Sequence, residues 1–145
     1  MKWLRKIVGG GGVIGDIDHV AIVVSDMDGS VEFYTGVLGL RLIRDGRSRG
    51  GEKKTFLGTE SRALIALTED KTSKRADGCL PGGVNHIAFS VDDVEKMSVV
   101  LKERGVNFIE EKTGEDGKVK AYHFLDPDGL ELEICGRTKG EVPKY

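Results

Sequence analysis

The 145-residue sequence predicts an α+β fold in which two βαβββ repeats form curved mixed sheets. The main observation is an internal repeat: residues 18–24 read Asp-His-Val-Ala-Ile-Val-Val, and residues 85–91 read Asn-His-Ile-Ala-Phe-Ser-Val. His19 and His86 hold the same place in the two copies and are 67 positions apart (86 minus 19). Each copy is also followed by one helical pattern and three strand patterns. Self-similarity at this spacing indicates a duplicated supersecondary unit.

The first repeat begins with a strand predicted over residues 17–25, which are rich in Val and Ile. A helix follows, because four apolar residues recur at helical spacing: Val31, Tyr34, Val37 and Leu38. We expect Asp28 or Ser30 to cap this helix and Gly39 to end it. The remaining strand patterns cover residues 40–44, 53–58 and 62–68. The glycine-rich residues 45–51 between them are expected to form a turn or mobile loop, with residues 46–51 as a lid.

The second repeat follows the same order, beginning with a strand predicted over residues 84–91. Its helix is indicated by Val94, Met97, Val100 and Leu101 on one face, and Gly105 is expected to end it. Three further strands are predicted over residues 106–111, 119–125 and 130–135. Residues 126–129 read Asp-Pro-Asp-Gly, which favours a type I turn between the last two strands.

The domain organisation follows from these two repeats. We expect one domain over residues 16–136, made of repeats 16–68 and 84–136, with a polar linker between them. Residues 1–15 are expected to be a flexible lead-in, because they hold four successive glycines. Residues 137–145 are expected to be a poorly ordered tail.

The composition excludes several classes of partner. The net charge is −2 and no basic block occurs, which argues against nucleic acid and against an anionic membrane surface. No apolar run approaches the length of a membrane span. The two cysteines, Cys79 and Cys135, are too few for a disulfide framework and suit the cytoplasm.

The candidate site begins with the two repeated histidines. A lone histidine on a strand is more often a hydrogen-bonded core residue than a metal ligand. Here the repeat symmetry would bring His19 and His86 close together, which favours a metal site if a carboxylate lies nearby. The last predicted strand carries Glu131 and Glu133 on one face. We expect Glu131, near the turn, to face solvent and the deeper Glu133 to need a partner.

Four stretches together resemble the vicinal oxygen chelate superfamily: residues 18–24, 33–40, 85–89 and 124–133. That superfamily includes glyoxalase I, methylmalonyl-CoA epimerase, fosfomycin- and bleomycin-resistance proteins, and extradiol dioxygenases. The resemblance covers residues 16–136 and implies a glyoxalase-like fold around a central metal cleft. It also implies that His19, His86 and Glu133 hold a divalent metal ion, and that the protein is a homodimer.

A fourth ligand of the family is missing here. Glyoxalase I and the epimerase resemble one another in using a further ligand on the fourth strand of the first repeat. One repeat length before Glu133 stands Ala66, which cannot bind a metal. Three ligands with one negative charge leave a divalent ion at about +1 with open positions. We therefore expect a small, anionic substrate that chelates through two oxygens.

His123 marks another departure from the family pattern. Extradiol dioxygenases and fosfomycin-resistance proteins resemble this chain in having three protein ligands, but place a tyrosine at the position of His123. This histidine is expected to be either an acid or base near neutral pH or an exposed strand residue. Fosfomycin-resistance proteins also usually carry a threonine where this sequence has Ala21.

The leading hypothesis is a metal-dependent enzyme in which the ion is a Lewis acid and Glu133 and His123 are the catalytic groups. Lyase or isomerase chemistry is favoured, ahead of dioxygenation and of thiol transfer to an epoxide. The alternative from another class is a metal-free protein that sequesters a ligand, as bleomycin-resistance proteins do. The metal is expected to be iron, manganese, nickel, cobalt or zinc. Candidate contacts to an anion are Arg44, Arg47, Arg49, Arg62 and Arg137.

Overall fold

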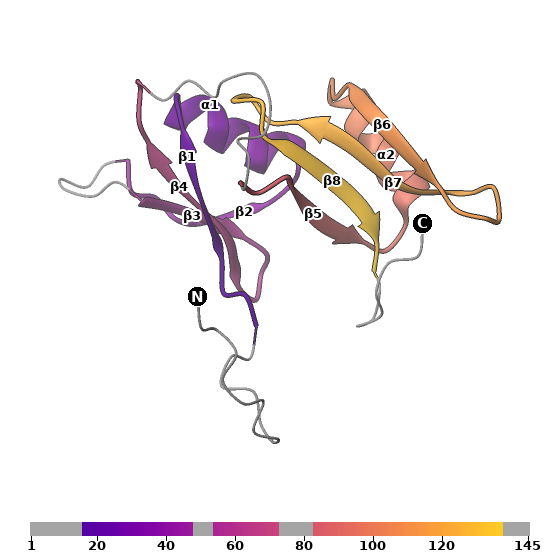
Figure 1. Ribbon diagram of the computed structural model, residues 1–145. Helices are drawn as coiled ribbons and strands as arrows, with labels where there is room; N and C mark the ends of the chain where they lie inside the picture. The colour runs from indigo at the N-terminus through magenta and orange to yellow at the C-terminus, as the bar shows by residue number, and fades with distance from the viewer. Residues whose placement is uncertain (1–15, 48–53, 73–82, 138–145) are drawn as a thin grey trace, which may run out of the picture.

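The computed structural model describes residues 16–47, 54–72 and 83–137, which form two four-stranded mixed sheets (Figure 1). The first sheet has the order β1-β4-β3-β2 and the second the order β5-β8-β7-β6. In each sheet the first strand pairs in parallel with the last, and the other pairs are antiparallel. The predicted fold class, two βαβββ repeats, is confirmed. The predicted lead-in, lid and terminal tail lie wholly or largely outside the described residues, as does most of the linker.

The elements of the first repeat are β1 (Val20–Val24), α1 (Met27–Glu32), the π-helix η1 (Phe33–Val37), β2 (Arg41–Arg44), β3 (Lys54–Gly58) and β4 (Ala63–Glu69). Those of the second are β5 (His86–Val91), α2 (Val94–Glu103), β6 (Phe108–Thr113), β7 (Val119–Leu125) and β8 (Glu131–Gly136). Each predicted strand is present, with bounds that differ by up to a few residues. The strand β6 begins later than predicted because the Val106 N–H still bonds to the Leu101 carbonyl at the end of α2.

The first helix differs from its prediction at its start. Asp26, and not Asp28 or Ser30, is the N-cap: its backbone is extended and its carboxylate accepts from the Asp28 N–H. The helix then continues as η1, where the hydrogen bonds span one more residue. Gly39 ends it as predicted, with φ of 78°, a value that glycine adopts without strain.

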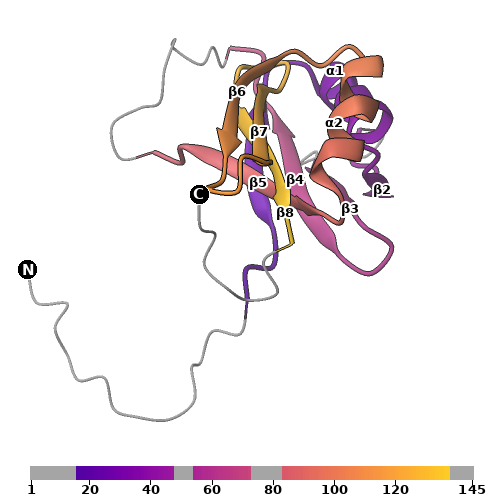
Figure 2. The same ribbon diagram turned by 90° about the vertical axis from the view of Figure 1, so that its right-hand side faces the viewer.

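One face of each sheet packs against a helix and forms the core. In β1, Ile22 and Val24 are buried, whereas Ala21 and Val23 on the other face are exposed. In β8, Leu132 and Ile134 belong to the same core, but Glu133 and Cys135 on the other face are buried as well. Figure 2 shows α1 and α2 on one side of the sheets. The functional side chains must therefore come from the other face.

Polar contacts near one end of the sheets join the two repeats. The Tyr34 hydroxyl, which is fully buried, donates to Asp126 Oδ2 at 2.9 Å. The Ser25 N–H donates to the Asp128 carboxylate at 3.0 Å, and Arg104 Nη1 donates to the Val37 carbonyl at 2.7 Å. The predicted turn is present, since the Gly129 N–H bonds to the Asp126 carbonyl. This turn thus positions β8 and also ties the second repeat to the first. No helix in the described residues is long and apolar enough to cross a membrane.

Asp93→Ala is expected to lower the free energy of unfolding by about 1 kcal/mol, because it removes the N-cap of α2. The Asp93 carboxylate accepts from the Lys96 N–H at 2.9 Å. Asp92→Ala is the matched control: its side chain is 89% exposed and pairs only loosely with Arg137, at 3.3 Å. Urea unfolding of both variants measures the effect. Equal stability of the two variants would contradict the assigned cap.

Candidate metal centre

The candidate site lies on the face of the second sheet that the helices leave uncovered. His86 on β5 is the strand partner of Glu131 on β8, and His123 on β7 is the partner of Glu133 on β8. Since residues two apart in a strand share a face, all four side chains project from the same side. Sequence alternation and register thus gather two imidazoles and two carboxylates in one patch.

Glu133 is the central residue of this patch. Its Oε2 lies 3.0 Å from His86 Nε2 and 3.4 Å from His123 Nε2. The Glu133 side chain is only 2% exposed, and that of His123 is 5% exposed. A buried carboxylate costs several kcal/mol unless cationic or hydrogen-bonding groups surround it. The sheet has therefore placed a negative charge where it requires a positive partner.

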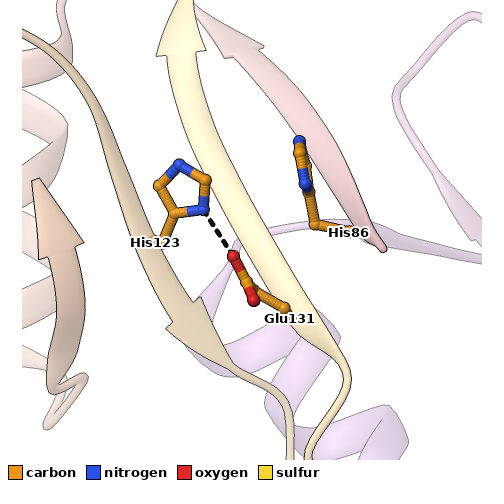
Figure 3. Close-up of side chains that lie close together, drawn as sticks. All are labelled: His86, His123 and Glu131. Carbon is orange, nitrogen blue, oxygen red and sulfur yellow. Dashed lines mark hydrogen bonds and ion pairs between the residues drawn. The ribbon is translucent and has the colours of Figure 1, made fainter. Parts of the chain in front are cut away.

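The other ring nitrogen of each histidine bonds to a side-chain oxygen. His86 Nδ1 lies 2.7 Å from Asn85 Oδ1, and His123 Nδ1 lies 2.7 Å from Glu131 Oε1 (Figure 3). His19 Nδ1 lies 2.6 Å from Asp18 Oδ1. Because these oxygens are acceptors, each Nδ1 is the donor, and in the neutral ring Nε2 then carries a lone pair for another partner. Histidines that bind metals commonly show this arrangement.

The donor set fits a divalent transition metal. One donor atom from each of His86, His123 and Glu131 lies within 4.8 Å of the other two, and Figure 3 shows Glu131 facing His123, with His86 on the strand at the other side of β8. Neutral imidazole and carboxylate are ligands that zinc, iron, manganese, nickel and cobalt accept. The buried charge of Glu133 adds the electrostatic attraction for a cation.

The three predicted ligands do not all meet within one chain. His86 and Glu133 lie together, whereas His19 precedes β1 in the first sheet. The His19 side chain is 36% exposed, and its ring packs edge-on against Phe56 at 5.5 Å between centroids. Among the described residues, the group of donor atoms within 4.8 Å of one another comprises His86, His123 and Glu131, and includes neither His19 nor Glu133.

The structure contradicts two expectations about solvent exposure. The sequence predicts that Glu131 faces solvent, but its side chain is only 28% exposed and bonds to His123. The alternative of an exposed strand histidine at 123 also fails, since His123 is buried. The register of β7 on β8 causes both differences, and the tight turn of residues 126–129 sets that register. A hairpin alignment across this turn is the sequence signal that pairs His123 with Glu133.

The candidate arginines have partners of their own. Arg47 bonds to Asp45 and Asp28, Arg62 to Asp16, and Arg137 to Asp92. The Arg44 guanidinium lies over the Phe56 ring at 4.4 Å. Arg49 lies outside the described residues. Arg44 and His19 therefore both contact the Phe56 ring, and Arg62 also lies beside His19, since it donates to the Asp18 carbonyl.

Cys135 lies two residues beyond Glu133 on the same face of β8 and is buried. Burial, followed by the negative charge of Glu133, raises the pKa of the Cys135 thiol to about 11. In a Cys79→Ser variant, we expect Cys135 to react slowly with Ellman's reagent at pH 8, since about one thiol in a thousand is ionised. Reaction as fast as in the urea-unfolded variant would contradict this placement.

The fold and this cluster define a class: a protein of two βαβββ repeats with imidazole and carboxylate donors on one sheet face. The family model described as the Glyoxalase/Bleomycin resistance protein/Dioxygenase superfamily matches residues 16–134. The chain belongs to this superfamily.

Individual relatives include two different kinds of enzyme. Metallothiol transferase FosB of Staphylococcus epidermidis is 31% identical over 135 residues, which cover 91% of this chain and 89% of the relative. A probable lactoylglutathione lyase of Vibrio parahaemolyticus is 33% identical over 125 residues, covering 83% of this chain and 89% of the relative. The crystal structure of a glyoxalase family protein from Enterococcus faecalis matches with a TM-score of 0.68 at 28% identity, covering 83% of this chain and 96% of that one.

Proposed function

We propose that this protein is a divalent-metal-dependent enzyme that acts on a small, anionic substrate with two chelating oxygens. The observation that carries the proposal is the buried Glu133 carboxylate between His86 Nε2 and His123 Nε2. His19, His86 and Glu133 are the proposed ligands. A bound ion supplies Lewis acidity, which lowers the energy of negative charge developing on a substrate oxygen.

The charge of the ligand set supports an anionic substrate. Two neutral imidazoles and one carboxylate leave a divalent ion at about +1. Ala66, the counterpart of Glu133 in the first repeat, is fully buried in β4 between its strand partners Ala21 and Phe56. Its methyl group adds no negative charge. The burial of Glu133, whose side chain is 2% exposed, reduces screening by water and strengthens the attraction between the remaining positive charge and an anion.

We propose that two copies of the chain complete the site as a homodimer. His19 and the exposed Ala21 and Val23 share the face of the first sheet that is left uncovered by the helices of the described residues. Val23 is 45% exposed, so this face carries an apolar side chain that a partner could cover. Packing this face on the second sheet of another copy would bury Val23 and bring His19 to His86 and Glu133.

Within this site Glu133 is the group we propose for moving the substrate proton. A carboxylate that faces the substrate in a buried setting can take a proton from a carbon next to a carbonyl and return it elsewhere. That is lyase or isomerase chemistry, in line with the similarity to lactoylglutathione lyases. The similarity to FosB favours a second candidate, transfer of a thiol. We also propose that the protein is cytoplasmic, because a chain with only two cysteines suits a reducing compartment. Both reactions are compatible with that compartment.

The test compares the two reactions on one preparation. The metal-stripped protein is reloaded with manganese, nickel, zinc or iron and assayed for lactoylglutathione formation and for thiol addition to fosfomycin. Turnover that requires the metal and is lost in Glu133→Gln supports the proposal and selects the reaction. Tight ligand binding that is the same with and without chelator, with no turnover, supports the metal-free sequestering protein instead.

A further inference from the structure

His123 has a carboxylate oxygen at both of its ring nitrogens. Nδ1 lies 2.7 Å from Glu131 Oε1, and Nε2 lies 3.4 Å from Glu133 Oε2. Ionised carboxylates only accept hydrogen bonds, and a neutral imidazole has a single N–H to donate. One of the two contacts therefore requires a cation between the nitrogen and the oxygen, which is either a second proton on the ring or a metal ion.

The two distances show which contact that is. A charge-assisted N–H···O bond is about 2.7–2.9 Å long, as the contact of Nδ1 with Glu131 is. The contact of Nε2 with Glu133 is longer, at 3.4 Å. In the neutral ring the proton is therefore on Nδ1, and the lone pair of Nε2 faces the oxygen of Glu133. With side chains 5% and 2% exposed, water cannot screen this repulsion.

A metal ion resolves the contact. With metal–ligand bonds of about 2.1 Å, neighbouring ligand atoms lie roughly 3.0–3.4 Å apart around one ion. Glu133 Oε2 lies 3.0 Å from His86 Nε2 and 3.4 Å from His123 Nε2, so both distances fall in this range. The Glu131 carboxylate would then hold the His123 ring in the orientation and tautomer that a ligand needs.

We propose that His123 is a further ligand of the same metal ion as His86 and Glu133, with Glu131 as its positioning residue. This inference rests on the metal site of the proposed function. It fills the ligand position that Ala66 leaves open, but from β7 of the second sheet. It also reassigns His123 from the acid–base role suggested by the sequence. Because imidazole is neutral, the site keeps its charge of about +1.

One consequence separates this ligand set from the three-residue set. His86, His123 and Glu133 all belong to the second sheet of one chain. If His123 is a ligand, the His19→Ala variant keeps three ligands on one chain, and we expect it to retain measurable metal affinity. If His123 is not a ligand, that variant retains only His86 and Glu133. Replacing His123 is expected to weaken binding at least about 100-fold, and replacing Glu131 about 10- to 100-fold.

The test is a titration of the metal-stripped, full-length protein with cobalt(II), followed by visible absorption and by competition with a chelator. The variants are His123→Ala, His123→Phe, which keeps a buried ring of similar size, and Glu131→Gln. Glu110→Gln is the matched control, since Glu110 lies beside His123 in the sheet but is 49% exposed and pairs with Lys112. Circular dichroism confirms that each variant is folded.

The expected result is weaker cobalt binding and a changed absorption spectrum in both His123 variants, weaker binding in Glu131→Gln, and no change in Glu110→Gln. His86→Ala tells the two proposals apart. If His86→Ala abolishes binding but both His123 variants bind with the affinity and spectrum of the unmodified protein, the role of His123 is overturned and the metal site stands. If His86→Ala binds normally, the metal site itself is refuted.

Discussion

Glu133→Gln is expected to abolish metal binding at micromolar metal and all metal-dependent turnover. The substitution keeps the size of the side chain but removes the negative charge that lies within 3.4 Å of both imidazoles. Loss of one partner from a buried charged cluster costs about 3–5 kcal/mol, or roughly a 150- to 5,000-fold loss of affinity. Isothermal titration with zinc measures this change directly.

The control for this prediction is Glu110→Gln, which removes a carboxylate from the neighbouring strand β6. Glu110 is half-exposed and pairs with Lys112, so its loss is expected to change zinc affinity less than twofold. Equal affinities of Glu133→Gln and the unmodified protein would contradict a metal site at Glu133. Equal losses in the two variants would indicate a general effect of sheet charge.

A mixture of His19→Ala and Glu133→Gln is expected to show more turnover than either variant alone. In His19→Ala the lost side chain belongs to the first sheet, and in Glu133→Gln it belongs to the second. If two copies share each site, a mixed dimer has one intact site and one doubly altered site. Random exchange of subunits then gives about one quarter of the unmodified activity, because half of the dimers are mixed.

The measurement is turnover after the two purified variants are unfolded together in urea and refolded, beside each variant treated alone. Activity near one quarter supports sites shared between copies. Activity of the mixture no higher than the average of the separate variants would show that no site combines the two chains. Sedimentation of each variant provides the check that dimers form.

The fold can be predicted from the sequence because both repeats show the same local patterns of apolar residues and of glycines. Residues 18–24 and 85–91 show the same alternation, and glycine ends both helices with φ of 78° and 86°. The strand β7 matches its prediction to the residue. These features depend on neighbours in sequence, where period and turn chemistry are informative.

Features that depend on cross-strand register are less accessible to sequence. Glu131 and Glu133 are correctly placed on one face, but the partner of Glu131 is His123, eight residues earlier and on another strand. Asp26, Asp28 and Ser30 are all residue types that can cap a helix. Asp26 is the cap because its backbone is extended, which the sequence does not show. The position of His19 relative to His86 depends on how whole sheets assemble, which no local pattern encodes.

The most direct test of the metal centre is elemental analysis of the purified protein beside a His86→Ala variant. His86 is one-third exposed, and its Nε2 lies 3.0 Å from Glu133 Oε2, so the substitution removes a ligand at the rim of the site and leaves the core intact. We predict about one transition-metal ion per chain in the unmodified protein and almost none in the variant. A protein that carries no metal, and takes up none when zinc, manganese, nickel or iron is added, would contradict the metal centre.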